Sequence, residues 1–147
     1  MSAKIPESPK KLYKNVKIPY FKRGNYIFYR KIDFNLKSRY KKVTYTYEKY
    51  DSKGELIDEY IHRQGDNPAV LIYRQNFLAE LQYWKHGNKH REWKPAIILL
   101  DRKRKIVNEK WYINNRKLKD NEVEDKKKII ERRKKMYKVI LKMFENN

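Results

Sequence analysis

The residues best suited to proton transfer or metal binding in this sequence are three histidines, His62, His86 and His90. His86 and His90 are four residues apart, a spacing that places two metal ligands on one face of a helix. Gly87 stands between them and indicates a turn, which separates the two side chains. The chain contains no cysteine, so thiolate ligands and disulfide bonds are excluded. The sequence therefore predicts no metal site.

Side chains that carry acid–base or nucleophilic catalysis in other proteins occur here without a recognisable arrangement. Serine is found at positions 2, 8, 38 and 52, and none lies in a motif that activates a nucleophile. The four glycines form no phosphate-binding loop. The Asp58–Glu59 pair fits a solvated strand face, and Glu122, Glu124 and Asp125 fit a helix N-terminus, which favours negative charge. We therefore expect a protein without catalytic residues and without a cofactor.

The strongest chemical signal is positive charge, because 38 Lys and Arg residues against 18 Asp and Glu residues give a formal net charge of +20. Such an excess favours an anionic partner: nucleic acid, an anionic membrane surface or an acidic protein. Residues 1–50 hold 14 basic and 3 acidic residues, a net charge of +11. Lysines outnumber arginines by 27 to 11, which favours contacts with phosphates over recognition of base edges. Thirteen tyrosines, five phenylalanines and three tryptophans supply rings on which single-stranded bases stack. The predicted nucleic-acid-binding residues are Lys10, Lys11, Lys14, Lys17, Lys22, Arg23, Lys37, Arg39, Lys41 and Lys42.

A short motif recurs along the chain at an interval of roughly 27 to 28 residues. Three imperfect copies each contain some of four features: a Trp–Tyr or Tyr–Trp pair, a Gly or Asn turn, a His–Arg pair, and a Pro–Ala pair followed by apolar residues. A unit of this length cannot bury its own apolar face, so neighbouring units are expected to stack. We expect the His–Arg pairs to bond backbone groups or to stack between units. The residues assigned to this structural repeat are His62, Arg63, Pro68, Trp84, Gly87, His90, Arg91, Pro95, Trp111 and Tyr112.

The pattern W-Y-x-N-G-K-x-H-R-x-x-G-P-A resembles the MORN-like β-hairpin repeats encoded by large DNA viruses. The resemblance covers roughly residues 60–119, less than half of the chain. The chain departs from the family where Trp93–Lys94 and Asn67 replace a glycine before the proline. Asn115 replaces the turn glycine, and Leu118–Lys119 replaces the last His–Arg pair. The resemblance implies stacked β-hairpins in a divergent, short viral protein, and MORN repeats have been linked to acidic lipids.

The order of elements follows from the hydrophobic periodicity. Residues 1–24, rich in Pro and Lys, are expected to form a basic extended arm. Residues 25–119 alternate with period two between turn residues, which predicts an antiparallel β domain with degenerate repeats. Within residues 120–147 the period changes to 3.6, which predicts an amphipathic helix over about 122–145 with a capping box at Asn121 and Glu124. The predicted fold class is therefore α+β, an antiparallel β meander of short hairpin repeats with a C-terminal amphipathic helix.

Strands are expected at residues 69–73, 96–100 and 106–113 of one antiparallel sheet. The apolar stripe of the helix is expected to be covered by the sheet or by another subunit.

Three functions fit these features. The first is a non-enzymatic, basic, viral protein that binds nucleic acid with little sequence preference. The second is a protein-interaction or assembly module, or a minor virion component, that uses its repeats and helix, with a protein partner or homo-oligomer formed through the helix. The third is binding to an anionic membrane surface. The sequence lacks a transmembrane segment and a secretory signal, so we expect it inside a cell: in the host cytoplasm, a viral factory or a virion if it is viral.

Overall fold

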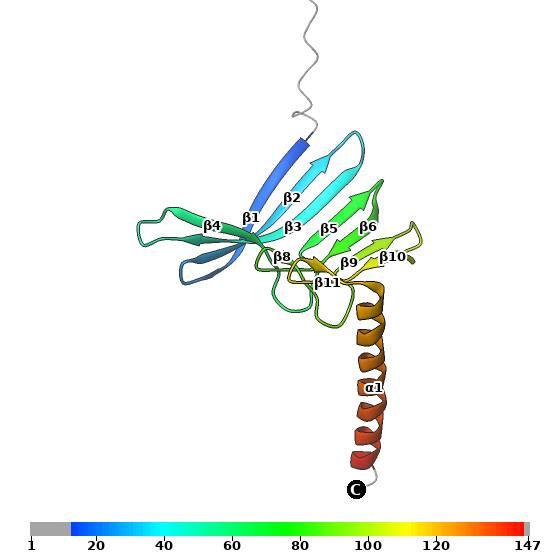
Figure 1. The fold of residues 1–147 in the computed structure, drawn as a ribbon. Helices are drawn as coiled ribbons and strands as arrows, with labels where there is room; N and C mark the ends of the chain where they lie inside the picture. Colours follow the sequence, from blue (N-terminus) through cyan, green and yellow to red (C-terminus); the bar gives the residue numbers. More distant parts are fainter. Residues whose placement is uncertain (1–12, 146–147) are drawn as a thin grey trace, which may run out of the picture.

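The structure, a computed structural model, describes residues 13–145 (Figure 1). It contains an antiparallel sheet, two small hairpins beside it and one C-terminal helix. The strands are β1 (Tyr13–Arg23), β2 (Tyr26–Asn35), β3 (Tyr40–Tyr50), β4 (Leu56–Ile61), β5 (Val70–Arg74), β6 (Phe77–Gln82), β7 (Trp84–Lys85), β8 (Asn88–Lys89), β9 (Ile97–Leu100), β10 (Ile106–Lys110), β11 (Tyr112–Ile113) and β12 (Arg116–Lys117), and the helix is α1 (Asp120–Glu145). These elements confirm the predicted α+β fold and its hairpins.

The eight-stranded sheet has the order β1-β2-β3-β5-β6-β9-β10, and β4 also pairs with β3. The sheet forks at β3, because residues 41–44 of this strand pair with β5 whereas residues 46–50 pair with β4. The β3–β4 hairpin therefore extends away from β5, β6, β9 and β10, whereas β2 stays paired with β3 as far as Lys49 (Figure 1). Neighbouring strands are joined mostly by short turns, as the alternation of apolar runs and turn residues predicts.

The predicted boundary between an arm and the β domain at residue 24 differs from the structure. Residues 13–23 form β1, which pairs with β2 from Tyr13↔Asn35 to Arg23↔Tyr26. Pro19 is compatible with this strand because an edge strand has one row of backbone groups without a ladder partner. The lysine-rich composition hides the strand, since β1 is exposed from Lys14 onward. Residues 1–12, the rest of the expected arm, lie outside the described residues.

The two predicted strands at 69–73 and 96–100 are confirmed as β5 and β9 of the main sheet. The third, at 106–113, is divided. Residues 106–110 form β10 of the main sheet, but Tyr112 and Ile113 form β11 and pair with β12 in a separate small hairpin. The chain leaves the sheet at Trp111, a buried residue between the two strands.

The core is small, as expected for a chain with 39% hydrophobic residues. One cluster joins Tyr83, Ala96 and Ile98, with Leu81, Leu100 and Tyr112 packed around it. Ala69 and Ala96 of the Pro–Ala pairs are completely buried. Small side chains at these positions allow the loop of each repeat to approach the sheet closely.

Helix α1 begins two residues earlier than the predicted capping box indicates. Glu122 accepts a hydrogen bond at 3.2 Å from the backbone N–H of Lys119 and is also held by the guanidinium of Arg116. Glu122 thus takes the acidic position of a capping box that the sequence assigned to Glu124. These two contacts, the Arg116 hydrogen bond first, lower the pKa of Glu122 to about 2.

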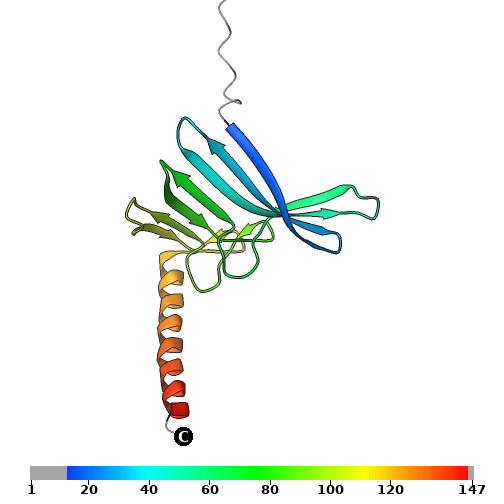
Figure 2. The same ribbon diagram turned by 180° about the vertical axis from the view of Figure 1, so that it is seen from behind.

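The helix projects from one end of the sheet, as the front and rear views both show (Figures 1 and 2). No residue of α1 is buried. The expectation that the sheet covers the apolar stripe is therefore wrong for the described chain. The helix instead contacts the loop before β9 through Lys126 and Arg133, whose charged groups lie over the ring of Trp93. Among residues 13–145, no helix is both long and apolar enough to cross a bilayer.

Candidate functional site

Three hairpins leave the sheet from equivalent backbone positions. Each hairpin is closed at its base by a backbone hydrogen bond. The N–H of the last residue of the hairpin donates to the carbonyl oxygen of its first residue. The three closing bonds are His62 N–H to Tyr45 O at 2.9 Å, His90 N–H to Tyr83 O at 3.0 Å, and Leu118 N–H to Trp111 O at 2.9 Å. The β3–β4 hairpin is thus a long version of the β7–β8 and β11–β12 hairpins. Leu118 occupies the position that histidine holds in the first two copies.

Each histidine of these copies bonds the turn of the following hairpin. His62 Nδ1 accepts a hydrogen bond from the backbone N–H of His86, and His90 Nδ1 accepts one from the backbone N–H of Asn114, both at 3.0 Å. An accepting Nδ1 carries no proton, so the neutral His62 ring is protonated at Nε2. Burial, followed by the charges of His86 and Lys85, lowers the pKa of His62 to about 4.

The two arginines of the motif, Arg63 and Arg91, each form a hydrogen bond that stabilises the loop that follows. Arg63 donates to the carbonyl of Pro68 at 3.1 Å, and its guanidinium lies 4.0 Å from the ring centre of Tyr45. Arg91 repeats both contacts, with Pro95 at 3.2 Å and Tyr83 at 3.7 Å. These contacts fix the guanidinium groups within the fold.

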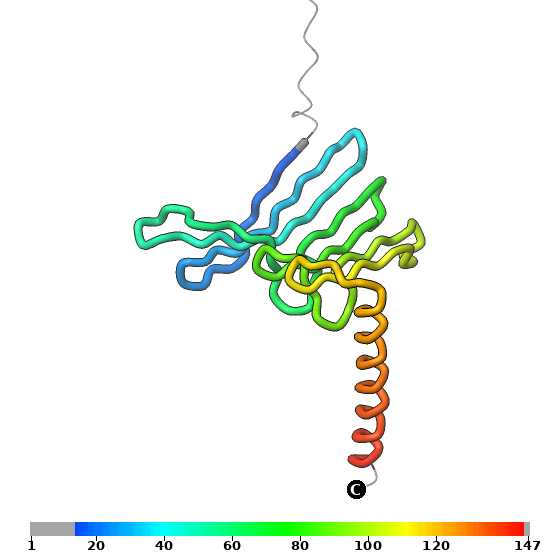
Figure 3. The backbone as a smooth tube through the Cα atoms, in the orientation of Figure 1, coloured from blue at the N-terminus to red at the C-terminus, as the bar shows by residue number. Residues whose placement is uncertain are grey.

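The two loops, residues 62–69 and 90–96, lie next to each other below the sheet (Figure 3). Arg91 joins them through two hydrogen bonds to the Asp66 carboxylate, at 2.8 and 3.0 Å. The repeat residues therefore build a continuous scaffold. Trp84 donates its indole N–H to Gln82 at 2.9 Å, and Tyr112 packs on the Tyr83 cluster.

The turns of the small hairpins need positive φ at both central residues. His86 and Gly87 have φ of 49° and 82°, and Asn114 and Asn115 have φ of 46° and 70°. These values are typical of the two-residue type I′ turn that joins the two strands of a β-hairpin. Gly87 has a second constraint, because a Cβ atom there would lie 2.9 Å from Cδ1 of Tyr60.

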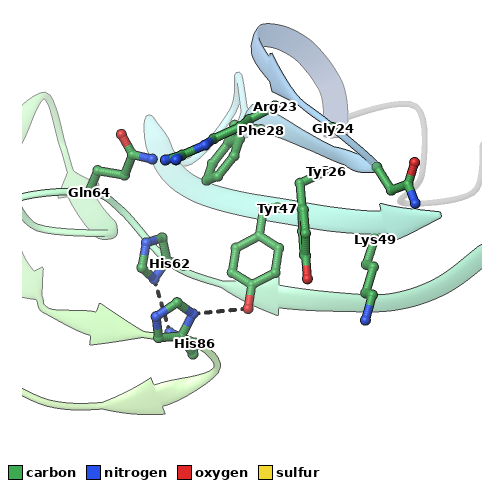
Figure 4. A pocket seen from close by; sticks show the side chains of 10 residues that line it. Arg23, Gly24, Tyr26, Phe28, Tyr47, Lys49, His62, Gln64 and His86 are labelled. Carbon is green, nitrogen blue, oxygen red and sulfur yellow. Dashed lines mark hydrogen bonds between the residues drawn. The ribbon is translucent and has the colours of Figure 1, made fainter.

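A cleft of about 670 Å³ opens where the β1–β2 turn meets the first repeat loop (Figure 4). Three aromatic residues and two cations dominate its lining, together with two histidines. The lining residues are Arg23, Gly24, Asn25, Tyr26, Phe28, Tyr47, Lys49, His62, Gln64 and His86. None of these residues is acidic, so the lining combines flat apolar rings with positive charge, and Asp58 faces Lys49 across the β3–β4 ladder outside the lining.

The rings of the cleft belong to one aromatic network. Tyr47 lies 5.7 Å from Tyr26 and 5.6 Å from Phe28, measured between ring centres. The Tyr47 hydroxyl forms a 3.0 Å hydrogen bond with Nδ1 of His86, which fixes the Tyr47 ring (Figure 4). The network continues along β1 to Phe21 and Tyr20, which are 46% and 50% exposed. Solvent-exposed rings thus extend from the cleft across the surface of β1.

Residues that pair across an antiparallel ladder project to the same face of a sheet, and successive residues alternate. The cleft face carries Phe28 and Tyr47, whereas the opposite face carries Glu48. On the opposite face, two lysines are paired with carboxylates: Lys17 bonds Glu48, and Lys31 bonds Glu59. Burial alone would raise the pKa of Glu48, but the hydrogen bonds from Lys17 and Tyr50 lower it overall.

The predicted nucleic-acid-binding residues do not form one patch. Alternation along β1 places Lys14 and Arg23 on the cleft face and Lys17 and Lys22 on the opposite face. Lys37 and Arg39 are exposed in the β2–β3 turn. Lys41 lies on the cleft face with its ammonium 4.5 Å from the ring centre of Tyr73, and Lys42 lies on the other face. Lys10 and Lys11 lie outside the described residues. Among the members of this set that the structure describes, only Arg23 lines the cleft.

The sequence missed Tyr26, Phe28, Tyr47, Lys49 and Gln64 as site residues. They come from β2, β3 and the loop after His62, and no local motif joins them. The only local signal is the alternation of aromatic residues in each strand, which indicates the face they share but not the cleft.

No cluster of His, Cys, Asp and Glu suited to a metal ion occurs in the described part of the chain. Comparison with known proteins adds no relative, because no family model, no curated protein and no solved structure matches the chain.

Proposed function

We propose that this protein is a non-enzymatic binding protein for nucleic acid, with the cleft face of β1–β3 as its single-strand-binding surface. The observation that carries the proposal is the cleft, which places Tyr26, Phe28 and Tyr47 between Arg23 and Lys49 without an acidic residue in its lining. Single-strand-binding surfaces combine stacking rings with cations that follow the backbone. The net charge of +20 supplies the long-range attraction.

The chemistry of the cleft supports binding with little sequence preference. Every base has a face that stacks on tyrosine or phenylalanine, so the rings do not distinguish between sequences. Lys49 is a point charge, and its ammonium lies 5.8 Å from the ring centre of Tyr26. A phosphate beside Lys49 would thus place its base near that ring. Two further arginines, Arg63 and Arg91, are held by backbone carbonyls and tyrosine rings and are therefore not available to read base edges.

The hairpin repeats support a second part of the proposal. We propose that the chain is a divergent relative of the MORN-like repeat proteins of large DNA viruses and acts inside the host cell or the virion. Three hairpins with the same closing bond and two histidines with the same role support a repeated ancestral unit. In this proposal the repeats are mainly the scaffold. The stacking rings and cations of the binding surface belong to β1–β3, and His62, Gln64 and His86 of the repeat segment complete the lining of the cleft.

A charge-matched pair of variants tests the binding site. We expect Arg23→Gln combined with Lys49→Gln to weaken binding of a fluorescent single-stranded oligonucleotide at least about tenfold at low salt, because two cations that neutralise phosphates are removed. Lys103→Gln combined with Lys105→Gln removes the same charge from the exposed β9–β10 turn and serves as the control. Equal weakening by both pairs would show that only net charge matters and would overturn the assignment of the cleft.

A further inference from the structure

The C-terminal end of α1 is apolar on almost every side and lies in solvent. Seven of the nine residues from Met136 to Phe144 are apolar or aromatic, and the other two are Lys138 and Lys142. The seven side chains are between 42% and 75% exposed. Lys138 and Lys142 are four residues apart and therefore share one face of the helix. The remaining faces of these last turns present only apolar surface.

The preceding turns of the helix are strongly basic. Nine Lys and Arg residues and a single acid, Glu131, lie between Lys126 and Lys142. Two of the cations hold the helix to the rest of the protein: Lys126 and Arg133 lie 4.5 and 4.1 Å from the ring centre of Trp93. The other cations face solvent, so α1 carries a concentrated positive charge beside its apolar end.

Charge and shape distinguish the possible occupants of this surface. A second copy of α1 would bring two helices of the same strong positive charge together, which is unfavourable. A groove on another protein buries one stripe of a helix, at positions i, i+3, i+4 and i+7. Here Val139, Ile140 and Leu141 are successive residues and point in three directions. An apolar layer that surrounds the helix end would cover all three of these side chains, whereas a groove would cover only one side of the helix.

We propose that α1 attaches the protein to anionic lipid bilayers, with Met136–Phe144 immersed in the interface and the lysines and arginines among the headgroups. Interfacial helices of this kind bury their apolar residues roughly 5–10 Å into the boundary between headgroups and acyl chains. Lys138 and Lys142 can extend their ammonium groups to the headgroups while their methylene chains stay in the apolar layer. The proposal is independent of nucleic-acid binding, because no residue of α1 lines the cleft. The β1–β2 hairpin, whose turn borders the cleft, and α1 lie on opposite sides of the ribbon (Figure 1).

Co-sedimentation of the full-length protein with vesicles tests this proposal. We expect binding to phosphatidylcholine vesicles that contain about one-third phosphatidylserine, and at least about tenfold weaker binding to vesicles of phosphatidylcholine alone. Ile140→Glu combined with Phe144→Glu should lower the binding to anionic vesicles at least about tenfold. The control is Ile106→Glu combined with Val107→Glu, which makes the same change at exposed positions of β10. An equal decrease with both pairs would show a purely electrostatic attraction and would overturn insertion, as would the absence of binding to anionic vesicles.

A fluorophore reports insertion directly. The chain has no cysteine, so Met143→Cys provides a single labelling site for an environment-sensitive dye, and Val107→Cys provides the control site. We expect a blue shift of the emission on addition of anionic vesicles for the label at 143 and none for the label at 107. An unshifted label at 143 on bound protein overturns the proposal. Concentration-dependent dimerisation that the Ile140→Glu and Phe144→Glu pair abolishes, without vesicle binding, would instead assign the surface to a second copy.

Discussion

The hydrogen bond between His62 and His86 depends on an unprotonated Nδ1 of His62. Nδ1 of His62 accepts the backbone N–H of His86 at 3.0 Å, and the two imidazole rings are 4.4 Å apart between centres. The bond connects the end of the β3–β4 hairpin to the turn of the β7–β8 hairpin. Protonation of His62 at Nδ1 would remove the acceptor and place a positive charge in a buried position beside His86.

This contact predicts a loss of stability in mild acid. The pKa of His62 is lowered from 6.5 to about 4 by folding, so between these values the unfolded chain binds the proton more strongly. Stability is therefore lost as the pH falls from about 6.5 towards 4. We expect the free energy of unfolding to drop by about 2 kcal/mol between pH 7 and about pH 5.

Urea unfolding at the two pH values measures this drop. His62→Asn is the matched variant, because its side-chain oxygen can accept the His86 N–H but does not titrate. In this variant the free energy of unfolding should fall much less between pH 7 and 5, because most of the expected drop of about 2 kcal/mol comes from His62. An undiminished drop would assign the acid sensitivity to other groups.

The turn of the β7–β8 hairpin should tolerate no side chain at position 87. In Gly87→Ala the new Cβ atom would lie 2.9 Å from Tyr60, and φ is 82°. Gly54→Ala has nearly the same φ, 81°, with nothing within 4 Å of its Cβ. We expect a loss of about 1 kcal/mol for Gly54→Ala from backbone strain alone and a loss about 1 to 3 kcal/mol greater for Gly87→Ala. Thermal unfolding of both variants checks this, and equal losses would show that Tyr60 moves aside without cost.

The guanidinium of Arg91 should not be replaceable by an ammonium group. It bonds the carbonyl of Pro95, forms two bonds to Asp66 and stacks on Tyr83, and lysine cannot make all these contacts at once. We expect Arg91→Lys to lower the free energy of unfolding by about 1 to 3 kcal/mol, measured by denaturant titration. Arg132→Lys on the exposed surface of α1 is the control and should change stability by less than about 0.5 kcal/mol. Similar values for the two variants would mean that Arg91 adds nothing beyond its charge.

Most strands were predictable because their signal is local. Period-two runs bounded by turn residues located β5, β9 and β10, and the 3.6-residue period located α1. Strand β1 was hidden because an edge strand exposed on both faces needs no apolar alternation, and Pro19 suggests an irregular segment. This has a practical consequence: removal of residues 1–23 would delete a sheet strand as well as a set of cations.

The cleft could not be predicted because it is assembled from distant positions. Tyr26 and Tyr47 are 21 residues apart in sequence, and their 5.7 Å ring contact depends on the register of β2 against β3. A shift of one residue in this register would move Tyr47 to the opposite face. The basic residues were visible in the sequence, but which of them remain unpaired depends on carboxylates such as Glu48, which only the folded sheet brings near Lys17.

A salt titration should distinguish the contribution of base stacking to affinity in the cleft from the contribution of charge. Tyr26→Leu removes an exposed ring but no charge. We therefore expect affinity for a single-stranded oligonucleotide to fall about 5- to 100-fold with an unchanged dependence on salt, since one base–ring contact contributes about 1 to 3 kcal/mol.

In the Arg23→Gln and Lys49→Gln pair, the log–log salt slope itself should become shallower by about 0.7 for each phosphate that the variant no longer neutralises. Tyr137→Leu on α1 removes a ring that is more exposed than Tyr26, at 63% against 37%, and does not line the cleft, so it should leave affinity and slope unchanged. Fluorescence anisotropy over a salt series measures both quantities. Because duplex bases stack on each other and leave no free faces, Tyr26→Leu should not weaken duplex binding. An equal drop in affinity for duplex and single strand would contradict base stacking at Tyr26 and leave phosphate attraction as the sole source of affinity.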